Sequence, residues 1–120
     1  MNVLDRDTAA MYALWFRALS DPTRLLVLSL IATRGRPLSV GEIVAALDVG
    51  QPTVSQHLKV LKEACFVVVE QQGTRRLYSI NPRCLTEFPT AAAVVMANVE
   101  QVAAPEKVRP PWAAIETASA

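Results

Sequence analysis

The chain has 120 residues, a formal net charge of +1 and 52% hydrophobic residues, which suits one small globular domain and excludes a disordered chain. No apolar run approaches the length of a membrane span, and the N-terminus lacks a secretory pattern. Two cysteines do not make a disulfide framework, so we expect a cytoplasmic protein. So high an apolar content in so short a chain favours a large interface with a second copy.

The first third of the chain predicts two helices. Apolar residues recur at helical spacing from Thr8 to Leu19, and Asp21 can cap a second helix that has Pro22 in its first turn. The second helix should run to about Ala32. Because it is apolar nearly all round, we expect it to be the buried centre of the domain. Leu38 then adds one short strand.

A helix, a tight turn and a second helix follow. Ser39 and Glu42 have the spacing of a capping box, so they predict the start of the first helix. Residues 48–50 supply the turn, and Gly50 is an acceptable cap for a helix over 51–62. This order of elements is the signature of a helix-turn-helix.

The second of these helices has a polar face that is typical of DNA recognition. Val54, Leu58 and Leu61 form one stripe that faces a core. The rest of the surface carries short hydrogen-bonding side chains and lysine, where a merely solvated face would carry Glu/Lys pairs. Such side chains read base edges and hold phosphate oxygens. The candidate DNA-binding residues here are Gln51, Thr53, Ser55, Gln56, His57 and Lys59.

His57 has two possible roles. It lies at the margin of the apolar stripe, so its imidazole would either hydrogen-bond a phosphate or brace the helix against its neighbours. We place it with the DNA-binding residues because a helix-turn-helix holds this turn against the duplex.

Two β-branched stretches predict a hairpin with its turn at Gly73. The strands should cover residues 66–71 and 75–80. Arg75 and Arg76 follow the turn and are expected to clamp the DNA backbone. Residues 51–76 hold four basic and two acidic side chains, so we expect a modest dependence of DNA affinity on salt.

The end of the chain predicts another helical segment and a tail. Asn81 and Pro82 begin the segment, and Pro89 should kink or restart it. Residues 90–103 then carry an apolar face that, with the first helix, makes the natural dimer surface. We therefore expect residues 1–103 to form one DNA-binding and dimerisation domain and 104–120 to be a Pro/Ala-rich irregular tail.

Four of these motifs resemble the arsenic-repressor (ArsR/SmtB) family in order and spacing. They are residues 21–24, 38–43, 51–62 and 73–78, and the resemblance spans about residues 8–85. It implies an α+β, mostly α, winged helix-turn-helix with a two- to three-stranded wing, dimerising through its N- and C-terminal helices. It also implies a homodimeric repressor that binds a double-stranded DNA operator, expected to be an inverted repeat, and releases it when an inducer binds.

The metal-ligand sets that the resemblance implies are missing from this chain. Members that sense metals carry thiolates at the start of the third helix, or carboxylates and histidines on the last helix. Here Ser39, Val40 and Gly41 stand at the third-helix positions, and the last helix offers only Glu87 and Glu100. We therefore expect no metal cofactor, and the inducer stays unidentified.

Three other functions are weighed against this one. A thiol- or redox-responsive repressor would act through Cys65 and Cys84, which flank the open end of the hairpin; small apolar fillers are the alternative. A winged-helix protein-interaction module would need a hydrophobic patch where this chain has a polar helix face. An enzyme would need a base beside a nucleophile, and the one histidine has no convincing carboxylate partner, so we expect no catalysis.

Overall fold

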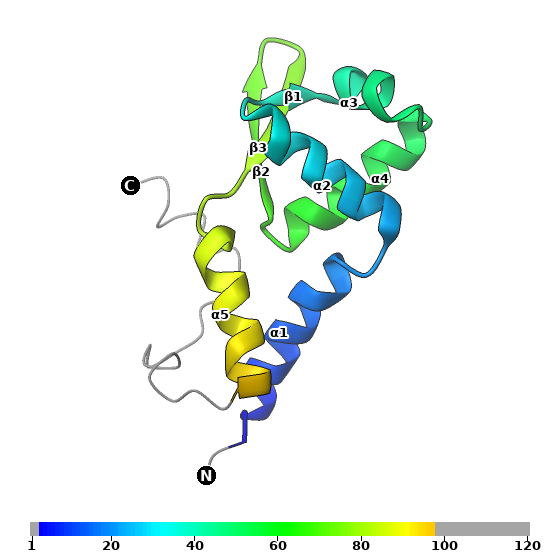
Figure 1. Ribbon diagram of the computed structural model, residues 1–120. Helices are drawn as coiled ribbons and strands as arrows, with labels where there is room; N and C mark the ends of the chain where they lie inside the picture. Colours follow the sequence, from blue (N-terminus) through cyan, green and yellow to red (C-terminus); the bar gives the residue numbers. More distant parts are fainter. Residues whose placement is uncertain (1–2, 98–120) are drawn as a thin grey trace.

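The computed structural model describes residues 3–97, which form five helices and a three-stranded antiparallel sheet (Figure 1). This is the expected mostly α architecture with a β wing. Across residues 3–97, no helix combines the length and apolar character that spanning a bilayer requires. The elements are α1 (Arg6–Ala18), α2 (Pro22–Arg34), β1 (Leu38–Ser39), α3 (Val40–Leu47), α4 (Gln51–Glu63), β2 (Val67–Gln72), β3 (Arg75–Ile80) and α5 (Cys84–Ala97).

Some expectations fall on the remainder of the chain. The domain boundary after residue 103, the tail 104–120, and the apolar positions Val99 and Val102 lie outside the described residues. The surface expected to form a dimer is therefore described only as far as the end of α5.

The capping signals in the sequence form the contacts that they predicted. The Ser39 hydroxyl accepts the Glu42 N–H at 3.2 Å, and the Glu42 carboxylate accepts the Ser39 N–H at 2.9 Å, which completes a capping box at α3. Asp21 caps α2 by accepting the N–H of Arg24 at 3.0 Å. Gly50 precedes α4 and supplies no side-chain cap. Local hydrogen bonds thus set where these helices begin.

The hydrophobic core lies where α2, α3, α4 and the sheet meet. Val54, Leu58 and Leu61 of α4 are at most 1% exposed, which confirms the stripe expected for that helix. Burying each such side chain contributes about 1.5–3 kcal/mol relative to leaving it in water. The other large apolar side chains that are fully buried are Val27, Ile31, Leu38, Ile43 and Val67.

The prediction that α2 is the buried centre is wrong. Only Val27 and Ile31 of this helix are buried, whereas Leu25 is 45% exposed and Leu26 is 56% exposed. A helix that is covered on one side buries one stripe of residues, whatever the composition of its other face. Apolar side chains on the outer face of α2 therefore stay in contact with solvent.

The wing is a sheet in the order β1-β3-β2. β2 starts at Val67, one residue later than expected, and the register places Gln72 opposite Arg75 across the turn. Gly73 has a φ of +60°, the left-handed conformation that glycine adopts without strain. β1 pairs with β3 and places the start of α3 against the wing, since Ser39 is both the partner of Leu77 and the cap of α3.

α5 is one helix that continues through Pro89, so the expected restart does not occur. Proline has no N–H to give to the carbonyl of Leu85. Because Leu85 is 66% exposed, water can satisfy that carbonyl instead.

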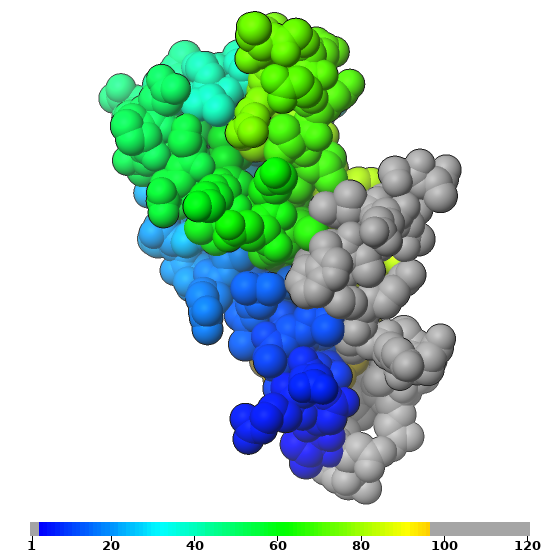
Figure 2. All heavy atoms as spheres, turned by 180° about the vertical axis from the view of Figure 1, so that it is seen from behind, coloured from blue at the N-terminus to red at the C-terminus, as the bar shows by residue number. Residues whose placement is uncertain are grey.

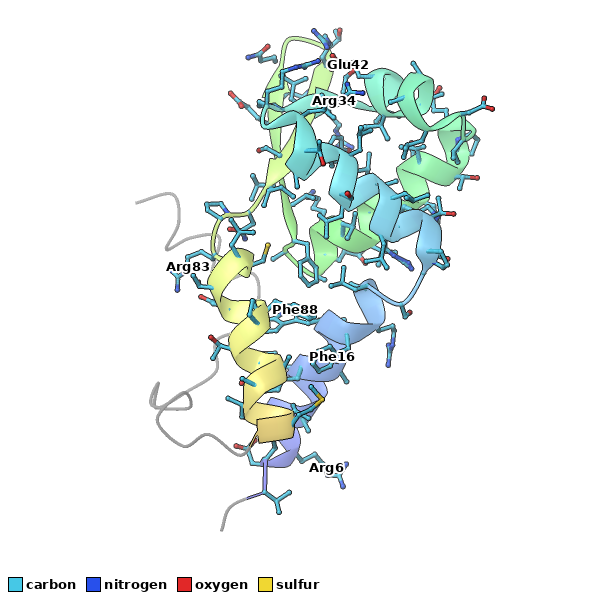
Figure 3. The ribbon with its side chains drawn as sticks, in the orientation of Figure 1. Arg6, Phe16, Arg34, Glu42, Arg83 and Phe88 are labelled. Atoms are coloured by element: carbon cyan, nitrogen blue, oxygen red, sulfur yellow. The ribbon has the colours of Figure 1, made fainter. Side chains whose placement is uncertain are left out.

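α1 and α5 lie side by side at the end of the molecule opposite the hairpin (Figure 1). Phe16 of α1 and Phe88 of α5 point toward each other (Figure 3), with ring centroids 5.3 Å apart. Phe88 also contacts Phe66, just before β2, at 5.6 Å. Edge-to-face aromatic contacts therefore join α1 to α5, and α5 to the segment that leads into the wing.

Candidate nucleic-acid interface

The outer face of α4 carries most of the predicted recognition residues. Its inner stripe is buried, so the opposite side chains are turned to solvent. The exposed ones are Gln51, Thr53, Ser55, Gln56 and Lys59. This face offers hydroxyl, amide and ammonium groups on a helix that the core holds from behind.

A groove runs between α4 and the wing. Figure 2 shows α4 and the hairpin on the same face of the molecule. Three of the groove-lining side chains are cationic and one, Glu63, is anionic. The residues that line it are Ser55, Lys59, Lys62 and Glu63 of α4, Arg76 and Tyr78 of β3, and Val40, Leu58 and Cys65. The excess positive charge fits a polyanion.

Lys62 lines this groove although it was absent from the predicted site. It follows Ser55 by seven residues and Lys59 by three, so the three side chains share one side of the helix. That spacing was available in the sequence and could have added Lys62 to the candidate residues.

The two arginines of the wing are placed on different surfaces. Arg76 lines the groove, whereas Nη2 of Arg75 lies 3.7 Å from Oε1 of Glu42, at the start of α3. Successive side chains of a strand point to opposite faces, which accounts for the separation. Only Arg76 is brought together with the residues of α4.

Glu42 holds two arginines as well as the cap of α3. Its Oε2 accepts a hydrogen bond from Nη2 of Arg36 at 2.9 Å. The N–H of Ser39, followed by the Arg36 guanidinium, lowers the pKa of Glu42 to about 2. The carboxylate is therefore charged at neutral pH, where it links α3 to Arg75 of the wing. Figure 3 shows Glu42 beside the hairpin.

His57 points away from the groove. Its side chain is 13% exposed, and its Nε2 lies 3.7 Å from Oδ1 of Asp21 at the start of α2. Of the two roles left open by the sequence, this placement favours bracing the helix over holding a phosphate.

Cys65 and Cys84 line one small cavity of about 10 Å³, with Trp15, Phe66 and Phe88 among its walls. Cys65, just past the end of α4, has a φ of +63°, the left-handed conformation that glycine adopts more readily. Burial raises the pKa of both thiols to about 11. The structure thus brings the two thiols to one place but suppresses the thiolate that redox chemistry requires.

We expect both thiols to react slowly with iodoacetamide in the folded protein at pH 7.5. A pKa raised from 9 to about 11 leaves about a hundredfold less thiolate, and each sulfur is also shielded by its neighbours. Mass spectrometry of quenched samples would give the rates, with the urea-unfolded chain as the control. Equal rates in the two states would restore the redox-responsive alternative.

No group of three or more histidine, cysteine, aspartate or glutamate side chains within residues 3–97 is arranged to hold a metal ion. Glu87, which the sequence offered as a possible ligand, instead accepts a hydrogen bond from Nε of Arg83 at 2.9 Å. The described part of the chain therefore gives no support to metal sensing.

Known proteins are similar to this chain in sequence and in fold. The model of the family described as "Bacterial regulatory protein, arsR family" matches residues 21–67. The HTH-type transcriptional regulator Rv2034 of Mycobacterium tuberculosis is 44% identical over 75 residues, which cover 62% of this chain and 68% of Rv2034. The transcriptional repressor SdpR of Bacillus subtilis is 33% identical, with 60% of this chain and 78% of SdpR covered.

A solved structure agrees with these relatives. The ArsR-like transcriptional regulator from Rhodococcus sp. RHA1 superposes with a TM-score of 0.69 over 82% of this chain and 91% of that one. The two sequences are 23% identical, so this likeness shows a common fold. Three observations point to the same family: the helix-turn-helix with its wing, the match of the family model, and relatives that are covered over more than two thirds of their length. The chain belongs to the arsR family of bacterial regulatory proteins and is a winged helix-turn-helix transcriptional regulator.

Proposed function

We propose that this chain is a homodimeric repressor that binds an inverted-repeat operator in double-stranded DNA. The observation that carries the proposal is the groove in which Lys59 and Lys62 of α4 face Arg76 of the wing. A helix that is polar on its outer face, with a basic groove beside it, can enter a major groove while the wing follows the backbone.

Each exposed residue of the site has a role in this proposal. Thr53, Ser55, Gln56 and Lys59 enter the major groove or hold its rim, and Gln51 meets a phosphate at the start of the helix. Lys62 of α4 and Arg76 of the wing neutralise phosphates along the groove. Arg75 reaches the backbone from the other face of the hairpin.

Exposed apolar side chains on α1 and α5 support a dimer. Leu14 and Phe16 of α1 are 36% and 37% exposed, and Val95 and Met96 of α5 are 46% and 82% exposed. A second copy that covers these two helices would bury this surface. In this proposal residues 1–103 form the folded, dimeric domain, and two α4 helices reach half-sites one DNA turn apart, roughly 34 Å.

Selection of binding sites from a random pool of DNA duplexes tests the proposal. With the full chain at near-physiological salt, we expect enrichment of an inverted repeat with half-sites one turn apart, and light scattering should give the mass of a dimer. A folded dimer that enriches no sequence would overturn the proposal and favour a protein-interaction module.

Arg76→Ala should weaken binding to the operator and to random duplexes alike. If its guanidinium neutralises one phosphate per protomer, the slope of log K against log salt should become shallower by about one per protomer. Fluorescence anisotropy at several salt concentrations gives this slope. Arg6→Ala removes the same charge at the far end of the molecule (Figure 3) and should leave the salt slope unchanged. An unchanged slope in Arg76→Ala would remove Arg76 from the phosphate contacts.

A further inference from the structure

A chain of polar contacts leads from the end of α1 to the middle of α4. Nε of Arg24 donates to the carbonyl of Ala18, the last residue of α1, at 3.0 Å. The N–H of Arg24 donates to Oδ1 of Asp21 at 3.0 Å, and the same oxygen lies 3.7 Å from Nε2 of His57. Residues that are 36 positions apart in the sequence thus meet at the start of α2.

For α4, the contact between His57 and Asp21 is unusual. Within residues 3–97, no side chain of α4 takes part in a hydrogen bond, and the 3.7 Å approach of His57 to Asp21 is the single contact within 4 Å between a basic side chain of α4 and an acidic group of another element. The helix also begins at Gly50 without a side-chain cap. The buried apolar stripe sets which side of α4 faces the core, and the contact with Asp21 adds a polar attachment between the middle of α4 and the start of α2.

The environment of the imidazole leaves Asp21 as the group that orients it. Nδ1 of His57 is buried and has no partner in the described part of the chain. The N–H of Arg24, followed by His57, lowers the pKa of Asp21, so its carboxylate is charged at neutral pH. Of the two ring nitrogens, Nε2 is therefore the one that faces a charged oxygen.

We propose that Asp21 and His57 form a brace that fixes the direction of α4 on α2, so that His57 is a positioning residue for DNA recognition. Arg24 extends the brace to α1, the helix expected at the dimer interface, so the reading face of α4 is set relative to the partner protomer. This inference rests on the proposed function, and it resolves the two roles of His57 in favour of the brace.

Substitutions at the two positions separate a brace from a direct contact. Asp21→Asn removes the charge but keeps a good cap for α2. His57→Leu fills a similar volume and removes the unpartnered nitrogen, so it should not lower the melting temperature. Asp48→Asn is the control, because it removes the same charge close to α4. Asp48 ends α3 in the left-handed conformation, which asparagine tolerates.

The losses in operator affinity caused by Asp21→Asn and His57→Leu should not add in the double variant. We expect Asp21→Asn and His57→Leu each to weaken operator binding by about five- to twentyfold and random binding by less than about twofold. The double variant should bind the operator within about twofold of the weaker-binding single variant. His57→Gln, which keeps a donor toward Asp21, should recover most of the affinity, and Asp48→Asn should not weaken binding. Fully additive losses would make His57 a direct DNA contact, and single variants that bind like the wild type would also overturn the brace.

A measurement without DNA separates the brace from the proposed function. Residual dipolar couplings of backbone amides in the free dimer report the direction of α4 relative to α2. The direction should differ from that of the wild type in Asp21→Asn and His57→Leu but not in Asp48→Asn. An unchanged direction overturns the brace even if the protein binds its operator, whereas a changed direction in a protein that selects no DNA sequence would overturn the proposed function alone.

Discussion

Gln56→Ala should reduce the preference for the operator over random duplexes by about five- to 150-fold, which corresponds to about 1–3 kcal/mol. Gln56 lies on the outer face of α4, and its exposed side chain has an amide that can both donate and accept. An amide of this kind pairs with the N6 and N7 atoms of adenine in the major groove. Competition of labelled operator against unlabelled random DNA measures the preference.

The matched control for this experiment is Gln72→Ala. Gln72 is also an exposed glutamine, but it lies at the tip of the hairpin, opposite Arg75. Its removal should change the affinities for operator and random DNA by the same factor. If Gln56→Ala also weakened all sequences equally, Gln56 would be a backbone contact without a role in specificity.

Phe88→Ala should lower the free energy of unfolding by about 3 kcal/mol, at the lower end of the range for deleting an aromatic ring, because the ring is partly buried. The ring contacts Phe16 and Phe66, so its loss opens the joint between α1, α5 and the wing. It also lines the small cavity beside Cys84, which would grow by the volume of the ring. Urea unfolding followed by circular dichroism gives the free energy. One protein concentration must be used throughout, because the stability of a dimer depends on it.

Leu85→Ala provides the comparison on the same helix. Leu85 precedes Phe88 by three residues and is 66% exposed, so truncating it should cost less than about 1 kcal/mol in a single chain. A loss of stability in Leu85→Ala as large as that in Phe88→Ala would mean that Leu85 is buried by the partner protomer. Equal stability of Phe88→Ala and the wild type would contradict the role of the ring as the joint.

Local signals explain why much of the fold could be predicted from the sequence. The capping box at Ser39 and Glu42, the cap at Asp21 and the turn at Gly73 each depend on residues within a few positions of one another. The stripe of α4 is likewise a property of one helix. Such features need no knowledge of what packs against them.

The expectations that differed depended on which elements come together. Leu25 and Leu26 are as apolar as the buried residues of α2, and only the position of the neighbouring helices leaves them exposed. The sequence could also not show that Asp21, the cap of α2, lies 3.7 Å from His57, the contact that favours the bracing role. Pro89 was expected to kink or restart the helix, and no restart occurs because α5 runs through it as one helix.

Arg75 and Arg76 are neighbours in the sequence, but the strand sends one toward Glu42 and the other into the groove. The length of the wing is therefore constrained during evolution. Inserting one residue in β3 between Arg76 and Leu77 would exchange the faces of the two arginines relative to the rest of the strand, turning Arg75 away from Glu42 and Arg76 out of the groove. Because the side chains repeat every two residues, viable insertions and deletions within these strands should come in pairs, while the turn at Gly73 can vary more freely.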